Sequence, residues 1–180
     1  MLRGTRLLLR RFRPEDTNDV FNYASDPVVT RAAGWEPHRT PFDSMAYIQR
    51  ALASDWGPST FAVEFVAEQK VIGVVDIRIV SRLWGLGEIG YTLARAYWGR
   101  GLNVEAGSLI LRYGFDELRL RRIRASCEPG NRRSYRTMEK LGMAMERCRM
   151  NMVDAHGRHV ERVTYSILRA DWDHRCGAAC

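Results

Sequence analysis

Long hydrophobic runs, metal-ligand spacings and internal repeats are all missing from this sequence. No apolar stretch approaches the length that crosses a membrane, and Met1–Arg13 has neither the apolar core nor the cleavage site of a signal peptide. The four histidines and four cysteines show no metal-ligand spacing, so no metal site is expected. Without a low-complexity tract or an interdomain linker, the chain is expected to form one cytoplasmic domain over residues 1–180, with reduced cysteines and a flexible tail at residues 173–180.

Lysine is also scarce. Only Lys70 and Lys140 are lysines among the 28 basic residues, and the arginines are spread along the chain rather than gathered in blocks. A dedicated nucleic-acid-binding function is therefore not favoured, and no aromatic strand typical of RNA-binding domains is present. A net charge of +7 would still attract an anionic ligand or an acidic partner.

What is present is the composition of an ordinary globular protein, 46% hydrophobic and 27% charged. Alternating β-branched residues predict strands, and apolar residues spaced three and four apart predict helices. The expected strands are Arg6–Phe12, Thr60–Ala67, Val71–Val80, Gly85–Ala94, Ile123–Cys127, Ala144–Val153 and Val160–Leu168, the last two joined by a turn at Asp154–Gly157. The expected helices are Pro14–Ala24, one ending near Ser54 after an irregular connection at Asp26–Asp43, Val104–Leu118, and one following Asn131. This order predicts an α+β fold, with a mixed, mostly antiparallel sheet of about six to seven strands flanked by about four helices.

The most informative segment runs from Tyr97 to Ala106 and reads YWGRGLNVEA. It joins an expected strand to an expected helix, and Gly99 and Gly101 allow backbone N–H groups to approach a bound anion closely. The unpaired N–H groups and the positive end of the helix dipole then favour phosphate. Because a tight turn that needs small residues for packing would show the same pattern, the neighbouring motifs have to decide.

Three further motifs accompany the glycine loop. Downstream, at the distance expected for a βα unit, the chain reads EPGNRRS over Glu128–Ser134, followed by a helix that ends in Lys140-Leu-Gly. Asn131 is well placed to cap this helix. Upstream, the chain reads RLLLR over Arg6–Arg10, followed by Glu15-Asp16.

Together these motifs resemble the GNAT superfamily of acetyl-CoA-dependent N-acetyltransferases, and within it the branch that acetylates the N-termini of ribosomal proteins. That branch has a (W/Q)-G-x-G-Y-A-T-E-A loop, an N-x-x-S element, a K-L-G-F helix end and an opening R-L-x-L-R…E-D segment. The resemblance extends in order from Arg6 to Trp172. It implies the GNAT fold and acetyl-CoA as cosubstrate, and it includes a homodimer among the expected assemblies because dimers are common in the branch.

The resemblance assigns the donor to the glycine loop. It implies that the strand near Leu93 pairs with the pantetheine arm and that Asn131 contacts the pantetheine region. The pyrophosphate is expected to lie against the backbone N–H groups of the loop, namely Gly99, Arg100, Gly101, Leu102, Asn103 and Val104. Two positions depart from the branch, since Leu102 replaces the usual Tyr and Asn103 replaces the usual Ala. Asn103 is expected to cap the helix.

The residue that would protonate the departing thiolate also differs from the usual one. In many GNAT enzymes a Tyr seven residues after the Asn has this role, and here that position is Met138. The Ser134 hydroxyl is the first candidate for a hydrogen bond to the thiolate, and Tyr135 is the second. A thiol with a pKa of about 8.5 is a tolerable leaving group, so a strong acid is not required.

Glu88 is the candidate general base. It shares a strand face with Gly90 and Thr92, whose small size leaves room for a substrate, and related enzymes often have a Glu in this strand. A partly apolar cleft would raise the pKa of the carboxyl and make it a better base. The alternative is a glutamate paired with a nearby arginine, and an amine that arrives neutral would need no base.

The amine acceptor is the least specified partner. The resemblance favours the N-terminus of a protein or peptide, which would attack the thioester directly in a ternary complex. The alternatives are a small-molecule amine, another donor such as succinyl-CoA, and a non-catalytic acyl-CoA-binding regulatory module on the same fold. Ala33–His38 and Trp84 are candidate walls of an acceptor pocket, although a Trp in a loop is as often a packing anchor.

Overall fold

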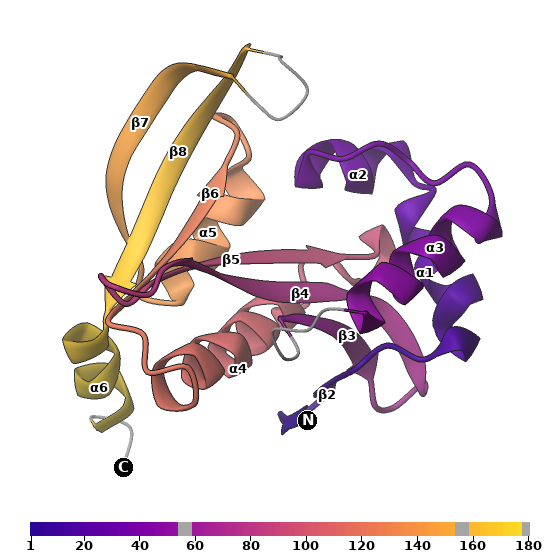
Figure 1. Ribbon diagram of the computed structural model, residues 1–180, viewed down its shortest axis with the longest axis horizontal. Coiled ribbons are helices and arrows are strands. Elements are labelled where there is room, and N and C mark those ends of the chain that lie inside the picture. The colour runs from indigo at the N-terminus through magenta and orange to yellow at the C-terminus, as the bar shows by residue number, and fades with distance from the viewer. Residues whose placement is uncertain (54–58, 154–158, 178–180) are drawn as a thin grey trace. The chain divides into compact units, whose positions relative to one another are not determined.

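The computed structural model describes residues 1–53, 59–153 and 159–177, and of residues 147–153, 159–160 and 176–177 it describes only the backbone (Figure 1). Within these ranges the chain has eight strands and six α-helices. In chain order they are β1 (Leu2–Arg3), β2 (Leu7–Arg10), α1 (Thr17–Ala24), α2 (Pro27–Ala33), α3 (Pro41–Leu52), β3 (Thr60–Phe65), β4 (Lys70–Ser81), β5 (Leu86–Leu93), α4 (Leu102–Asp116), β6 (Arg122–Cys127), α5 (Arg132–Lys140), β7 (Ala144–Val153), β8 (His159–Leu168) and α6 (Arg169–Gly177). The α+β class and the predicted strands and helices are confirmed, whereas the predicted turn at Asp154–Gly157 lies outside the described residues.

Three elements exceed the predicted number, namely β1, α2 and α6. Helix α2 occupies the segment expected to be irregular. The Asp26 side chain accepts a hydrogen bond from the Val28 N–H at 2.9 Å, Pro27 takes the first helical position, and Gly34 ends the helix at φ +80°. Helix α6 includes residues 173–177, which were expected in a flexible tail, and residues 178–180 lie outside the described ranges.

The strands are hydrogen-bonded in the order β1-β2-β3-β4-β5-β6-β8-β7. Strands β5 and β6 are parallel and α4 connects them, as a parallel pair requires a crossover. The pairs β1–β2, β2–β3, β3–β4, β6–β8 and β7–β8 are antiparallel. The sheet is therefore mixed and mostly antiparallel, as predicted.

The chain forms two compact units. One consists of residues 1–77 and 91–110, and the other of residues 78–90 and 111–180. Strands β4 and β5 and helix α4 each contribute residues to both units. A single-domain organisation of residues 1–180 stays a prediction.

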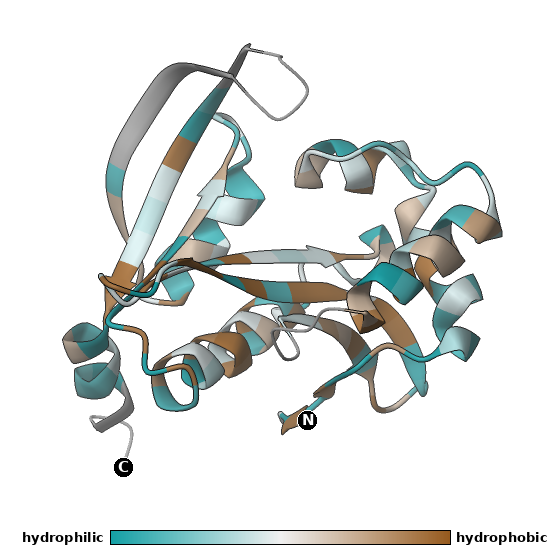
Figure 2. Cartoon of the chain, viewed as in Figure 1, coloured by the Kyte–Doolittle hydropathy of each residue, from teal (hydrophilic) through white to brown (hydrophobic). Residues whose placement is uncertain are grey.

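In the first unit, three helices cover a hydrophobic core. Apolar side chains from α1, α2 and α3 pack with residues of β3 and β4, the buried members being Phe12, Val20, Tyr23, Ala24, Val29, Ile48, Ala62, Val71 and Val74. Along α1 and α3, brown hydrophobic and teal hydrophilic residues alternate in the way expected for helices with one buried face (Figure 2). Leu7 and Leu9 of β2 are fully buried, which fixes the register of this strand.

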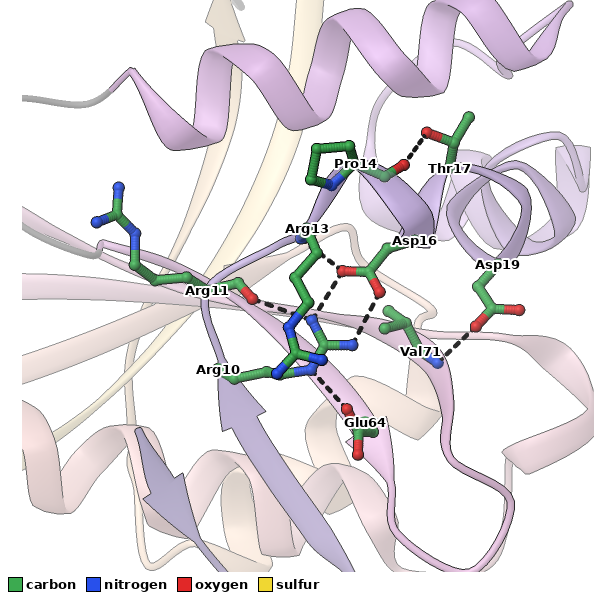
Figure 3. A network of polar contacts seen from close by, with 9 residues as sticks. All are labelled: Arg10, Arg11, Arg13, Pro14, Asp16, Thr17, Asp19, Glu64 and Val71. Atoms are coloured by element: carbon green, nitrogen blue, oxygen red, sulfur yellow. Dashed lines mark hydrogen bonds and ion pairs between the residues drawn. The ribbon is translucent and has the colours of Figure 1, made fainter.

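Beside these leucines, Arg10 is a buried cation with full compensation (Figure 3). Its Nη1 and Nη2 atoms donate to the two carboxylate oxygens of Asp16, each at 2.8 Å, and its Nε donates to Glu64 at 2.5 Å. The hydrogen bonds and charge of Asp16, together with Glu64, outweigh burial and raise the pKa of Arg10 further. The network joins β2, the 3-10 turn Pro14–Asp16 that precedes α1, and β3.

In the second unit, β6 has one buried and one polar face, as its alternation predicted. Ile123, Ala125 and Cys127 are buried, whereas Arg122 and Arg124 lie on the other face with Ser126. Helix α6 is held to the end of α4, because Trp172 packs against Phe115 with ring centroids 5.9 Å apart. Across the described residues, no helix is both long enough and apolar enough to cross a membrane.

We predict that Asp16→Ala lowers the free energy of unfolding by about 3–5 kcal/mol, because it leaves the buried Arg10 guanidinium without its bidentate partner. Asp173→Ala is the matched control. It breaks an exposed ion pair with Arg169 and should cost less than about 1 kcal/mol. Urea unfolding of both variants measures the difference, and equal losses would show that the Arg10 network does not stabilise the unit.

Candidate functional site

The glycine loop lies in the first unit, between the end of β5 and the start of α4. Gly99 and Gly101 have φ values of +77° and +76°, in the left-handed region that favours glycine. A Cβ atom at Gly99 would meet nothing within 4 Å, and one at Gly101 would meet only Nη2 of Arg6, at 3.8 Å. These glycines are therefore not required for tight packing, which was the alternative explanation of the motif. They leave open space beside the backbone, which is the space that a bound phosphate would need.

Helix α4 begins directly at this loop. The Gly101 carbonyl accepts hydrogen bonds from the N–H groups of Val104 and Glu105, at 3.1 and 3.2 Å. The first N–H groups of the helix, at Leu102 and Asn103, have no partner within it, and the positive end of the helix dipole lies here. The loop residues thus fit a diphosphate in both space and charge.

Asn103 does not have its predicted capping role. It is the second residue of α4, because the helix begins two residues earlier than expected and Gly101 provides the carbonyl that starts it. The Oδ1 atom of Asn103 is buried and has no hydrogen-bond partner among the described residues. Leu102 is buried, so the residue that replaces the usual Tyr contributes to the core.

Leu93, the predicted partner of the pantetheine arm, ends β5. Its side chain is buried, and its carbonyl accepts a hydrogen bond from Nε1 of Trp98 at 2.7 Å. A carbonyl oxygen has a second lone pair, so this bond leaves room for the predicted pairing. Strand β4 comes close to β5 here, since a Cβ atom on Gly73 would lie 2.1 Å from the Thr92 carbonyl oxygen.

The Arg100 side chain lies over two aromatic rings. Its guanidinium carbon is 5.4 Å from the ring centre of Tyr97 and 6.0 Å from that of Phe65. The Tyr97 hydroxyl donates to Glu68 at 2.5 Å, and this bond raises the pKa of Tyr97. Trp98 packs against the core of the first unit, so the loop is anchored on the side where it leaves β5.

The second unit contains Asn131, Ser134 and Tyr135. The Asn131 side chain accepts the Ser134 N–H at 3.1 Å, which confirms that it caps α5. Burial raises the pKa of the Cys127 thiol, and a hydrogen bond with the Ser134 side chain partly opposes that shift. Met138 is fully buried, so the position where many relatives have the catalytic Tyr belongs to the core. The roles of Asn131 toward the cofactor and of Ser134 toward the thiolate stay predictions.

Tyr135 supports the turn before α5. Its hydroxyl donates to the Glu128 carbonyl at 3.4 Å and accepts the Gly130 N–H at 3.2 Å. Its ring stacks on Tyr165 with centroids 5.9 Å apart. These contacts give Tyr135 a structural task, and its catalytic role stays a prediction.

Glu88 lies between two arginines on neighbouring strands of the second unit. Its Oε2 atom accepts from Arg78 of β4 at 2.9 Å and from Arg124 of β6 at 3.0 Å. The Glu88 side chain is 21% exposed. This geometry is the paired glutamate that was the alternative to a general base.

The candidate walls of the acceptor pocket have different environments. Trp35 packs against the first unit's core and stacks on Tyr47, with centroids 6.3 Å apart, and His38 bonds through Nδ1 to the buried Ser44 hydroxyl at 2.9 Å. Burial lowers the pKa of His38. Trp84 is 74% exposed. In the described ranges, no group of His, Cys, Asp and Glu side chains could hold a metal ion.

The sequence did not indicate which residues form polar contacts with the glycine loop and the first turn of α4. Arg6 donates to the Arg100 carbonyl, and Arg6 and Glu105 form an ion pair. Both residues belong to the quoted motifs, Arg6 in the opening segment and Glu105 at the E of the loop motif. That shared membership was the available signal, but the two positions are 99 residues apart in the chain.

Comparison with known proteins agrees with this geometry. Residues 6–144 match the family described as acetyltransferase (GNAT) domain. The chain is 30% identical over 169 residues to the uncharacterized N-acetyltransferase p20 of Bacillus licheniformis, covering 93% of this chain and 95% of that protein. It is 26% identical over 106 residues to the [ribosomal protein uS5]-alanine N-acetyltransferase of Escherichia coli, covering 58% of this chain and 55% of that protein.

A solved structure shares the fold over nearly the whole chain. The acetyltransferase (GNAT family) from Bacillus anthracis superposes with a TM-score of 0.81 at 30% identity, covering 93% of this chain and 97% of that one. The family match spans both the glycine loop and the Asn131 element. The chain therefore belongs to the GNAT acetyltransferase family, and it is an N-acetyltransferase with acetyl-CoA as its cosubstrate.

Proposed function

We propose that this enzyme acetylates the N-terminal amine of a protein or peptide, with the Gly99–Gly101 loop holding the pyrophosphate of acetyl-CoA. The observation that carries the loop assignment is the open space beside two left-handed glycines at the start of a 15-residue helix. The acceptor class is supported by the opening RLLLR segment and by the likeness to the uS5-alanine N-acetyltransferase.

The proposed reaction is a single displacement at the thioester carbonyl. The amine forms the new C–N bond, the C–S bond breaks, and the proton lost by the amine balances the thiolate that leaves. A thiol with a pKa of about 8.5 can depart without a strong acid, which is consistent with Met138 in place of a tyrosine. The part of this chain is to hold the donor, to position the amine and to stabilise the oxyanion through backbone N–H groups of β5.

The acceptor class can be tested with one peptide that contains both kinds of amine. We expect acetylation of a peptide with a free N-terminus and one internal lysine to occur at the α-amine, which has a pKa of about 8 and is more often neutral than the lysine amine. Mass spectrometry of fragments locates the acetyl group, and an N-terminally blocked copy is the control. Acetylation of the lysine alone, or of small amines but neither peptide, would contradict the proposal.

The loop assignment is tested by two substitutions of equal size. Gly101→Asp should weaken acetyl-CoA binding by roughly a hundredfold or more, because it adds a negative charge to the loop that would hold the pyrophosphate. Gly101→Asn has the same shape without the charge, and Asn tolerates the left-handed backbone, so it should bind more tightly than the Asp variant. Isothermal titration with acetyl-CoA measures both, and equal affinities for the two variants would remove the phosphate from this loop.

The base role of Glu88 is tested by the pH profile of Glu88→Gln. If the carboxylate accepts the proton of the amine, the variant should lose most rate below about pH 7, where the amine is largely protonated. Glu146→Gln is the matched control, since Glu146 has the same 21% exposure and pairs with Arg122. A Glu88→Gln profile parallel to that of the control would assign Glu88 to ion pairing with Arg78 and Arg124.

A further inference from the structure

Arg6 precedes β2 and makes two kinds of contact with the start of α4, all within the first unit. Its Nη1 atom donates to the Arg100 carbonyl at 3.0 Å, inside the glycine loop. Its Nε atom donates to Glu105 Oε2 at 2.9 Å. The other oxygen of Glu105 accepts the backbone N–H groups of Arg6 and Leu7, at 2.7 and 3.1 Å.

The contact with the Arg100 carbonyl sets the direction of an N–H group on the opposite side of the loop. In a trans peptide the C=O of one residue and the N–H of the next point in opposite directions. Because Arg6 draws the Arg100 carbonyl toward itself, the Gly101 N–H points away from Arg6. Glycine rotates freely about φ, so sterics alone do not hold this peptide plane.

The contact with Glu105 compensates a negative charge at the start of α4, where the phosphate is proposed to bind. A carboxylate in the first turn of a helix stabilises that helix, but it opposes a phosphate at the same end. Burial would raise the pKa of Glu105, yet the hydrogen bonds from Arg6 and Leu7 together hold it below its ordinary value, so the group is charged at neutral pH. The Arg6 guanidinium compensates this charge within an ion pair in which the Glu105 side chain is 15% exposed.

We propose that Arg6 is a positioning residue for the donor: it orients the Arg100–Gly101 peptide so that the Gly101 N–H faces the pyrophosphate, and it neutralises Glu105 behind the loop. This inference rests on the proposed role of the loop. Arg6 itself touches neither the thioester nor the amine in this arrangement.

The experiment compares Arg6→Gln, Arg6→Lys and, as control, Arg3→Gln, which changes an exposed arginine of the neighbouring β1. Arg6→Gln should weaken acetyl-CoA binding roughly tenfold, since it removes one charge-assisted hydrogen bond and an ion pair. Arg6→Gln should also lower the midpoint of thermal unfolding, because it breaks the ion pair with Glu105. Arg6→Lys can still pair with Glu105 and should unfold at the wild-type midpoint. A single ammonium does not reproduce the two-point contact of the guanidinium, so it should not recover the affinity. Arg3→Gln should bind like the wild type.

A second donor separates positioning from general damage. S-acetylpantetheine has the thioester but no pyrophosphate, so its affinity, measured by competition, should be the same in Arg6→Gln and in the wild type. Equal losses for both donors, or wild-type affinity for acetyl-CoA in Arg6→Gln, would overturn the role of Arg6 while leaving the loop assignment in place. Failure of the wild type itself to bind acetyl-CoA would overturn the loop assignment, and the role of Arg6 with it.

Discussion

The first unit depends on one buried cation. Arg10 lies at the end of β2, where its guanidinium is removed from water and faces two carboxylates from different elements (Figure 3). A buried charge is tolerated only with full compensation, so the positions of Asp16 and Glu64 are fixed once Arg10 is placed. Asp16 also accepts the Arg13 N–H at 2.7 Å, which sets the direction in which the chain enters α1.

The same strand supports the glycine loop a few residues earlier. Leu7 and Leu9 are buried in the core. Arg6, before them, bonds to the glycine loop at Arg100, and Arg10, after them, pairs with Asp16 at the start of α1. The two glycines of the loop face open space, so neighbouring side chains do not hold them in place. Its shape is instead set by polar contacts at its edges, from Trp98 to Leu93 and from Arg6 to Arg100. Anion recognition through backbone N–H groups requires this arrangement, in which the ends of the loop are fixed and its backbone is open to a ligand.

Sequence reasoning succeeded where a short pattern decides the structure. The alternation of Ile123, Ala125 and Cys127 marked β6, and the position of Asn131 marked the start of α5, because both depend on neighbours within a few residues. Helix α2 was missed although its signals, Asp26-Pro27 and Gly34, are local. One glycine and three prolines over Asp26–Asp43 favour a loop only if helix capping is ignored.

The side-chain environments of the site could not be predicted, because their partners are remote in sequence. Glu88 is paired with Arg78, which is 10 positions away in the sequence, and with Arg124, which is 36 positions away. Nothing in the local sequence distinguishes this pairing from an exposed carboxylate that faces a substrate. Asn103 was misjudged by a shift of two residues in the helix start, which changes a capping residue into one whose oxygen is buried. Boundaries of this kind depend on tertiary contacts rather than on propensity.

The buried thiol of Cys127 can report local opening of the native protein without any substitution. It lies at the end of β6, 4% exposed, against the first turn of α5 through its contact with Ser134. A thiol reagent reaches so buried a sulfur only when the structure around it opens, and burial also keeps the reactive thiolate scarce. Its labelling rate therefore reports how often the region around the end of β6 opens in the native protein, as the exchange rate of a single protected amide does. A bound molecule that holds this region closed would slow the reaction without touching the sulfur.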